Sequence, residues 1–171
     1  MKYIFFLIFF FTSGLASFDF INSFESDFIQ TVTDEKNKTL TYKGHLIAQK
    51  PQNAMWNYLL PVKKNVYITS YNVTIVEPEI EQVIVKKIES TFDFFTMIKN
   101  AKKVKENVYI AKYKESEFTI TKNGKFVESI SYADEFENKV KILFENQKQN
   151  QIINEQLFIP KFSADYDIIN D

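Results

Sequence analysis

Few side chains in this sequence have the types and spacing that catalysis or metal binding requires. Its single histidine, His45, falls in an extended stretch, on the strand face opposite Leu46 and Lys50. A lone histidine on a strand is far more often an ordinary surface residue than a ligand or a general base. The sequence also lacks cysteine, a glycine-rich phosphate loop, a serine nucleophile elbow and a histidine–carboxylate cluster at metal-ligand spacing. We therefore expect no catalytic residue, no metal site and no cofactor.

Three acidic residues alternate on one face of an extended segment: Glu77, Glu79 and Glu81. Because Lys86 and Lys87 follow closely, this pattern is typical of a solvated sheet edge that discourages pairing with another strand. We prefer this interpretation to a calcium site.

One cation occupies a position that calls for an explanation. Gly44, Leu46, Ala48 and Lys50 alternate on one side of an extended chain, so this apolar face ends in a lysine. Pro51 follows directly, removes a ladder donor and stiffens the turn. The alternation resumes at Ala54, Trp56 and Tyr58, which indicates two strands around a tight corner.

Length and charge limit the classes of protein that fit. At 171 residues the chain has the length of one domain, with enough residues for a sizeable core. Its 21 basic residues, all of them lysine, nearly balance 22 acidic ones, which gives no indication of nucleic-acid binding. We expect a monomer.

The first sixteen residues have the pattern of a signal peptide. Lys2 precedes an unbroken apolar run from Ile4 to Phe11, and Gly14-Leu15-Ala16 supplies small residues for cleavage after Ala16. The run is too short for a membrane span. We expect residues 1–16 to be removed and residues 17–171 to form one exported domain; the alternative is an uncleaved anchor.

Short alternating segments dominate the rest of the chain. We predict an amphipathic N-terminal helix over residues 17–24, a second helix over residues 91–104, and hairpin turns at residues 34–38 and at Asn123-Gly124. We predict about ten strands, at residues 24–32, 40–49, 54–60, 66–70, 73–76, 80–88, 108–113, 118–121, 126–132 and 140–144. This order describes a mainly β fold with short helices (α+β): a strongly curved antiparallel sheet or barrel.

Periodicity leaves open whether such a sheet is solid or hollow. Aromatic residues make up 16% of the chain, and a small barrel filled with them could have no cavity. The apolar face of the second helix could equally belong to a core helix or to a movable cover.

The order of several short motifs resembles one known family. These motifs are Phe28-Ile29-Gln30-Thr31-Val32-Thr33-Asp34, Gly44-x-Leu46, Lys50-Pro51, Trp56, Pro61, Glu81-Gln82, the Phe- and Met-rich helix, Phe158-x-Pro160 and Asp167-Ile168-Ile169. Each motif alone is weak, but together they resemble the periplasmic outer-membrane lipoprotein carrier family, LolA, over essentially the whole mature chain.

The resemblance implies an incompletely closed antiparallel barrel that encloses a hydrophobic cavity under a helical lid. It assigns the acyl-chain cavity to Phe28, Leu46, Ala48, Ala54, Trp56 and Tyr58, and the lid to Phe92, Phe95, Met97 and Ile98. In the family an arginine before the proline hydrogen-bonds to the lid. Lys50 stands at that position here and keeps the charge, but it lacks the planar fork of the guanidinium group.

The resemblance also implies a function without enzymatic chemistry. Such a carrier receives the acylated N-terminus of a lipoprotein from an inner-membrane ABC exporter and delivers it to an outer-membrane acceptor. The alternative on the same fold is a periplasmic envelope-stress sensor or lipid-binding regulator, but those proteins carry a further C-terminal domain and this sequence ends at Asp171. A hydrolase would need an activated nucleophile or paired carboxylates, and neither is evident.

Overall fold

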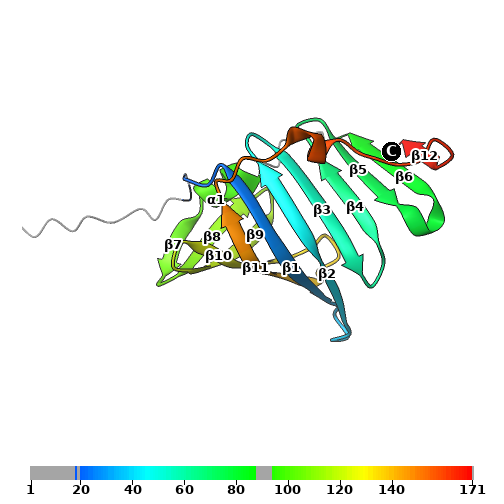
Figure 1. Cartoon of the computed structure of the whole chain (residues 1–171). Coiled ribbons are helices and arrows are strands. Elements are labelled where there is room, and N and C mark those ends of the chain that lie inside the picture. Colours follow the sequence, from blue (N-terminus) through cyan, green and yellow to red (C-terminus); the bar gives the residue numbers. More distant parts are fainter. Residues whose placement is uncertain (1–17, 19, 88–93, 171) are drawn as a thin grey trace, which may run out of the picture.

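A single twelve-stranded sheet dominates the computed structural model, which describes residues 18, 20–87 and 94–170 (Figure 1). The strands are β1 (Ser23–Thr33), β2 (Thr39–Gln49), β3 (Asn53–Leu60), β4 (Lys64–Ile68), β5 (Asn72–Glu77), β6 (Gln82–Lys87), β7 (Lys102–Lys105), β8 (Val108–Tyr113), β9 (Ser116–Asn123), β10 (Phe126–Ala133), β11 (Lys139–Gln149) and β12 (Asp167–Asn170). Their order in the sheet is β12-β6-β5-β4-β3-β2-β1-β11-β10-β9-β8-β7. All paired neighbours are antiparallel except β12 and β6, which run parallel.

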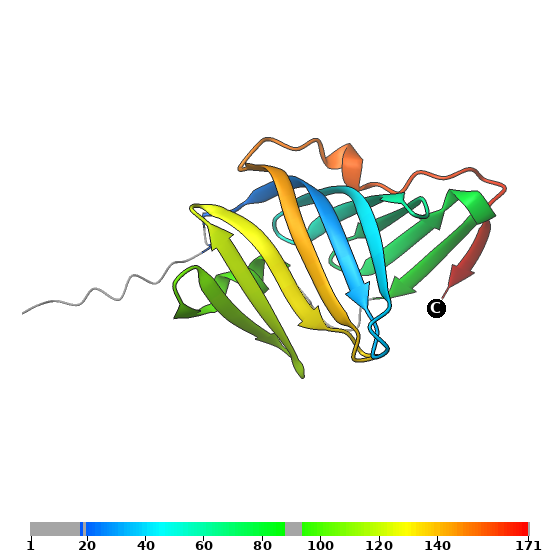
Figure 2. The same cartoon turned by 90° about the horizontal axis from the view of Figure 1, so that it is seen from below.

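The sheet is strongly curved, as the strand pattern predicts, and it is an open sheet rather than a closed barrel (Figure 2). It remains open because β7 and β12 form its two edges and do not pair with each other. Register shifts between Glu25 and Asp27, between Lys43 and Gly44 and between Val127 and Ser129 interrupt the regular pairing. Such bulges bend the strands that contain them and increase their twist.

Strands β1 and β2 show how the residues set this curvature. Phe28 on β1 pairs with Gly44 on β2 and is only 1% exposed. A Cβ atom at position 44 would lie 2.7 Å from the Phe28 ring and would also clash with the Asn57 carbonyl. Gly44 therefore allows the phenyl ring and strand β3 to approach the backbone of β2 closely.

The concave face carries the main hydrophobic core, together with the helix α1 (Phe94–Lys99). A smaller cluster of Tyr67, Val76 and Val83 lies on the opposite face of β4–β6, where Tyr166 packs against it. The segment 150–166, which contains the 3₁₀ helix η2 (Glu155–Phe158), runs along this outer side before β12 begins (Figures 1 and 2). None of the helices in the described part of the chain has the length and hydrophobicity of a transmembrane segment.

The predicted N-terminal helix is wrong. Of its residues, 18 and 20–24 are described, and none is helical. Phe18, Ile21 and Phe24 are buried at the spacing of a helix, but Ile21 N donates to Phe18 O at 3.0 Å within a turn, and β1 starts at Ser23. The spacing therefore reflects a turn that enters a strand.

The second predicted helix ends earlier than expected. Helix α1 stops at Lys99, and residues 102–105 form the edge strand β7, because Lys102 and Lys103 pair with Ile110 and Tyr109 on β8. Residues 88–93, which include Phe92, lie outside the described residues. The two residues of the β9–β10 turn are Gly124 and Lys125 rather than Asn123 and Gly124, since Asn123 still pairs with Phe126.

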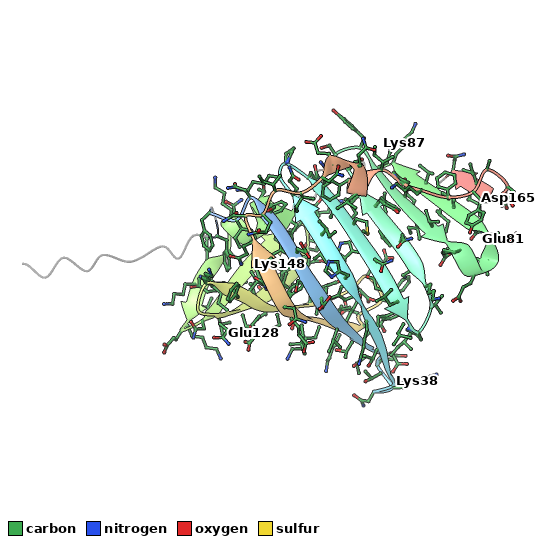
Figure 3. The ribbon with its side chains drawn as sticks, viewed as in Figure 1. Lys38, Glu81, Lys87, Glu128, Lys148 and Asp165 are labelled. Atoms are coloured by element: carbon green, nitrogen blue, oxygen red, sulfur yellow. The ribbon has the colours of Figure 1, made fainter. Side chains whose placement is uncertain are left out.

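The acidic segment is not an unpaired edge. Pro78–Ile80 forms the 3₁₀ helix η1, so β6 starts only at Gln82. Strand β12 pairs along β6 up to Val85, and Asp167 N donates to Glu81 O at 2.8 Å. Glu81 and Asp165 consequently lie at the same end of this edge (Figure 3). The expectation that the acidic residues prevent strand pairing is therefore wrong, because the carboxylates precede the strand and leave its backbone available.

Candidate functional site

A cavity of about 100 Å³ lies between α1 and the concave face of the sheet. Its lining is mostly apolar: Leu46 and Ala48 from β2, Asn53, Ala54 and Trp56 from β3, Ile68 from β4, Phe94 and Phe95 from α1, and Gln52 from the β2–β3 turn. Of the six residues that the sequence assigns to an acyl-chain cavity, this lining includes Leu46, Ala48, Ala54 and Trp56. Their side chains share the inner face because Leu46 pairs with Trp56 and Ala48 pairs with Ala54.

The other two predicted cavity residues lie farther along the same face. The Phe28 ring meets Trp56 and Tyr58 edge-on, with centroids 5.1 Å apart in both pairs. The Tyr58 hydroxyl donates to Gln30 Oε1 at 2.9 Å, and burial raises the pKa of Tyr58, with Tyr132 and Tyr42 adding to the effect. Phe28 and Tyr58 thus form an aromatic wall beside the cavity and do not line it directly.

Helix α1 presents its apolar residues to the sheet. Phe95 is 4% exposed, Met97 6% and Ile98 0%, and the three belong to the main core. Phe94 touches Phe95 and Phe24 edge-on, at 5.4 Å and 6.1 Å between centroids. An isolated helix of six residues is not stable in water, so the position of α1 depends on these contacts.

Lys50 connects the corner after β2 to this helix. Its Nζ donates to Asn22 Oδ1 at 3.2 Å and lies 5.9 Å from the centroid of the Phe95 ring. Its backbone N–H donates to Asn22 O at 2.9 Å. The cation therefore touches both the N-terminal segment and the helix that closes the cavity, at the position where the family resemblance places a latch.

Sequence reasoning missed four lining residues: Gln52, Asn53, Ile68 and Phe94. Ile68 could have been found by extending the alternation, because it pairs with Ala54 on the same face. Phe94 could also have been found, because it stands three residues before Met97 and four before Ile98, which is the spacing of one helix face.

His45 lies on the outer face, away from the cavity. Its Nδ1 is 2.8 Å from Asp27 Oδ1 and its Nε2 is 3.6 Å from Glu25 Oε1. Asn146 donates to the other oxygen of Asp27, and Lys148, which lies over β11 and β1 in Figure 3, donates to Glu25. Hydrogen bonds from Asn146 and His45 lower the pKa of Asp27. This network joins β2, β1 and β11. In the described ranges, no three His, Asp or Glu side chains are placed so that they could hold a metal ion.

Comparisons with known proteins agree with this architecture. Residues 19–115 match the family described as outer membrane lipoprotein carrier protein LolA. An outer-membrane lipoprotein carrier protein from Campylobacter jejuni is 41% identical over 99% of both chains, and one from Wolinella succinogenes is 31% identical over 91% of both. A solved LolA superfamily structure from Nitrosomonas europaea shares the fold, with a TM-score of 0.50 and 6% identity over 84% of this chain and 94% of that one. The chain therefore belongs to the outer membrane lipoprotein carrier family, LolA.

Proposed function

We propose that this protein is a non-enzymatic carrier that takes lipoprotein acyl chains into the space under α1 and shuttles them through the periplasm. The observation that carries the proposal is a small apolar cavity closed by a short helix, which lines it with Phe94 and Phe95 and buries Phe95, Met97 and Ile98. Membership of the lipoprotein carrier family supports the choice of cargo.

A lipoprotein needs such a carrier because its acyl chains are poorly soluble in water. Exposing a chain of about fifteen methylenes costs about 12 kcal/mol, at about 0.8 kcal/mol for each methylene. A triacylated lipoprotein therefore does not leave a membrane and cross water on a useful timescale unless its hydrocarbon is covered.

The described conformation is closed, so cargo has to displace the helix. A cavity of about 100 Å³ is smaller than the roughly 300–1,000 Å³ of ordinary ligand pockets. Burial of Phe95, Met97 and Ile98 stabilises the closed position of α1 by about 5–9 kcal/mol, at about 1.5–3 kcal/mol for each side chain. This partly offsets the gain from burying one acyl chain, so cargo binds but can also be released.

Lys50 adds to the closed state. Its contacts with Asn22 and with the Phe95 ring exist together only while α1 lies against the sheet. Lys50 thus takes the part of the family's arginine latch, and the residues Phe92, Phe95, Met97 and Ile98 form the lid that competes with cargo.

The route follows from the cargo and from the N-terminal sequence. We assign residues 1–16 to a signal peptide cleaved after Ala16, and residues 17–171 to one carrier domain that acts as a monomer. The protein receives lipoproteins from an inner-membrane ABC exporter and passes them to an outer-membrane acceptor.

Co-expression tests this proposal. The full chain is exported together with a triacylated lipoprotein, and the periplasmic fraction is purified without detergent. We expect a soluble one-to-one complex, and a mass for the carrier that starts at Ser17. Absence of the complex, with the carrier itself folded and abundant, would refute the carrier function.

A further inference from the structure

One row of apolar side chains crosses the concave face from the cavity to the sheet edge. Leu46 pairs with Trp56, Trp56 with Val66, Val66 with Ile75, Ile75 with Ile84, and Ile84 with Ile169. Directly paired residues project from the same face of a sheet, so all six side chains lie on the side that α1 occupies. We call these six residues the inner row.

The inner row is buried at the end near α1 and exposed at the sheet edge. Leu46 is 1% exposed, Val66, Ile75 and Ile84 are half-buried, and Ile169 is 41% exposed. On the opposite face of the same strands, Tyr166 packs on Tyr67, Val76 and Val83. The described chain therefore covers the outer face of β4–β6 more completely than the inner face.

The length of the inner row exceeds what the cavity can enclose. Six neighbouring strands span five spacings, or about 24 Å at about 4.8 Å each. The hydrocarbon core of a bilayer is about 30 Å thick, so one acyl chain extends for about 15 Å. A chain that enters beside Trp56 therefore has apolar surface available over its whole length, although the cavity itself measures about 100 Å³.

The chemistry of this surface suits hydrocarbon better than a peptide. Strands β4 and β5 pair with neighbours on both sides, and β6 does so up to Val85, so along the inner row the sheet presents side chains and not free main-chain groups. The inner row itself consists of aliphatic side chains and one indole, with no hydroxyl, amide or charged group among its six residues. A peptide laid across it would lose hydration of its own backbone without finding partners, whereas an acyl chain loses none.

We propose that Val66, Ile75, Ile84 and Ile169 form a lipid-binding surface that holds the part of a cargo acyl chain which the cavity under α1 does not enclose. The proposal rests on the carrier function proposed above and adds where the cargo lies. The hydrocarbon runs across the strands from Trp56 toward β12, and the C-terminal strand contributes its last contact.

The length of the bound acyl chain allows binding at this surface to be distinguished from binding in the cavity. Binding of fluorescent analogues of octanoate and palmitate is compared among the mature wild-type protein, Ile75→Asn and Ile84→Asn, with thermal unfolding as the check on folding. Ile152→Asn is the matched control, because Ile152 is fully exposed and lies outside the sheet. We expect each row variant to bind the palmitate analogue about tenfold more weakly, the loss of roughly two methylene contacts, and to bind octanoate like wild type.

Photo-crosslinking locates the chain without any substitution. Palmitate with a photoreactive group at its methyl end should label peptides from β5, β6 or β12 of the wild-type protein. The proposal would be overturned if crosslinks appeared only in β2, β3 and α1. It would also be overturned if the row variants bound both analogues like the wild type. Neither result would contradict the carrier function. Row variants that hold palmitate normally but fail to deliver it would also overturn the proposal, because they would assign the surface to a partner protein. A wild-type protein that binds neither analogue would refute the carrier function as well.

Discussion

If α1 and cargo compete for one space, shortening a side chain of α1 should tighten cargo binding. Phe95 is 4% exposed, lines the cavity, and has Lys50 Nζ 5.9 Å from its ring centroid. Burying a phenyl ring contributes about 1.5–3 kcal/mol, and a cation–π contact at a partly exposed site about 0.5–1 kcal/mol. Phe95→Ala therefore removes about 2–4 kcal/mol from the closed position of α1.

That loss translates into affinity. At about 1.4 kcal/mol per factor of ten, the apparent Kd for a fluorescent fatty acid should fall by about 30-fold at the lower end, provided the closed state dominates without cargo. The measurement is a fluorescence titration of the purified mature protein, together with denaturant unfolding.

Phe118→Ala is the matched control, because Phe118 is 9% exposed in the same core but belongs to β9. This variant should lower the free energy of unfolding by about 3–5 kcal/mol without increasing the affinity for the fluorescent fatty acid. If Phe95→Ala loses stability in the same way and binds the probe no more tightly than wild type, α1 is an ordinary core helix that does not compete with cargo.

Four further predictions test other parts of the account. Lys50→Leu removes the contacts with Asn22 and Phe95, so cargo should transfer to acceptor vesicles several-fold more slowly than from the wild type. Lys50→Arg should transfer cargo at the wild-type rate. Equal transfer rates for the wild type and both variants would exclude a latch. Gly44→Ala places a Cβ 2.7 Å from the Phe28 ring and should lower the free energy of unfolding in denaturant by about 1–3 kcal/mol. Gly124→Ala is the control: no atom lies within 4 Å of its Cβ, so only the positive φ should lower the free energy of unfolding, by about 1 kcal/mol. Equal losses would contradict the close packing at Gly44. Glu137 has a φ of 61°, so Glu137→Gly should gain about 1 kcal/mol and raise Tm, and a lower Tm would contradict the expected strain. In the folded protein the pKa of Asp27 lies below its ordinary 3.8, so its contribution to stability is present above pH 3.8 and is lost as the pH falls through the lowered pKa. The Tm of Asp27→Asn should therefore fall less between neutral and acidic pH than the Tm of the wild type. An equal fall in Tm would assign the acid sensitivity to other groups.

The strands of the meander could be predicted because their signals are local. In β1 and β2, apolar and polar residues alternate, and the polar turn 34–38 separates the two strands. Asp34 closes this turn by accepting N–H donation from Lys36 and Lys38 with its side chain. Asp134 does the same for Phe136 and Asn138 in the β10–β11 turn.

The two edges could not be predicted in the same way. Strand β7 has the sequence Lys-Lys-Val-Lys, is exposed at every position, and becomes a strand only because β8 supplies hydrogen-bond partners. Strand β12 is also exposed throughout and pairs with β6, more than eighty residues earlier in the chain. No local pattern indicates such a distant partner.

The residues of the candidate site also differ in whether local sequence or distant pairing determines their positions. Leu46, Ala48, Ala54 and Trp56 share the inner face because of alternation around one tight corner, which sequence alone reveals. The position of Phe28 beside the cavity, rather than in its lining, depends on Gly44 and on the bulge between Lys43 and Gly44. These features involve β1, β2 and β3 together. The continuation of the inner row to Ile169 depends on the register of six strands.

A distance measurement across the lid tests the central claim most directly. The chain contains no cysteine, so Lys99→Cys on α1 and Glu145→Cys on β11, both at exposed positions, allow two spin labels at defined sites. If cargo replaces α1, pulsed electron–electron double resonance should show a longer and broader distance distribution once a lipoprotein is bound. An unchanged distribution in a verified cargo complex would contradict the account.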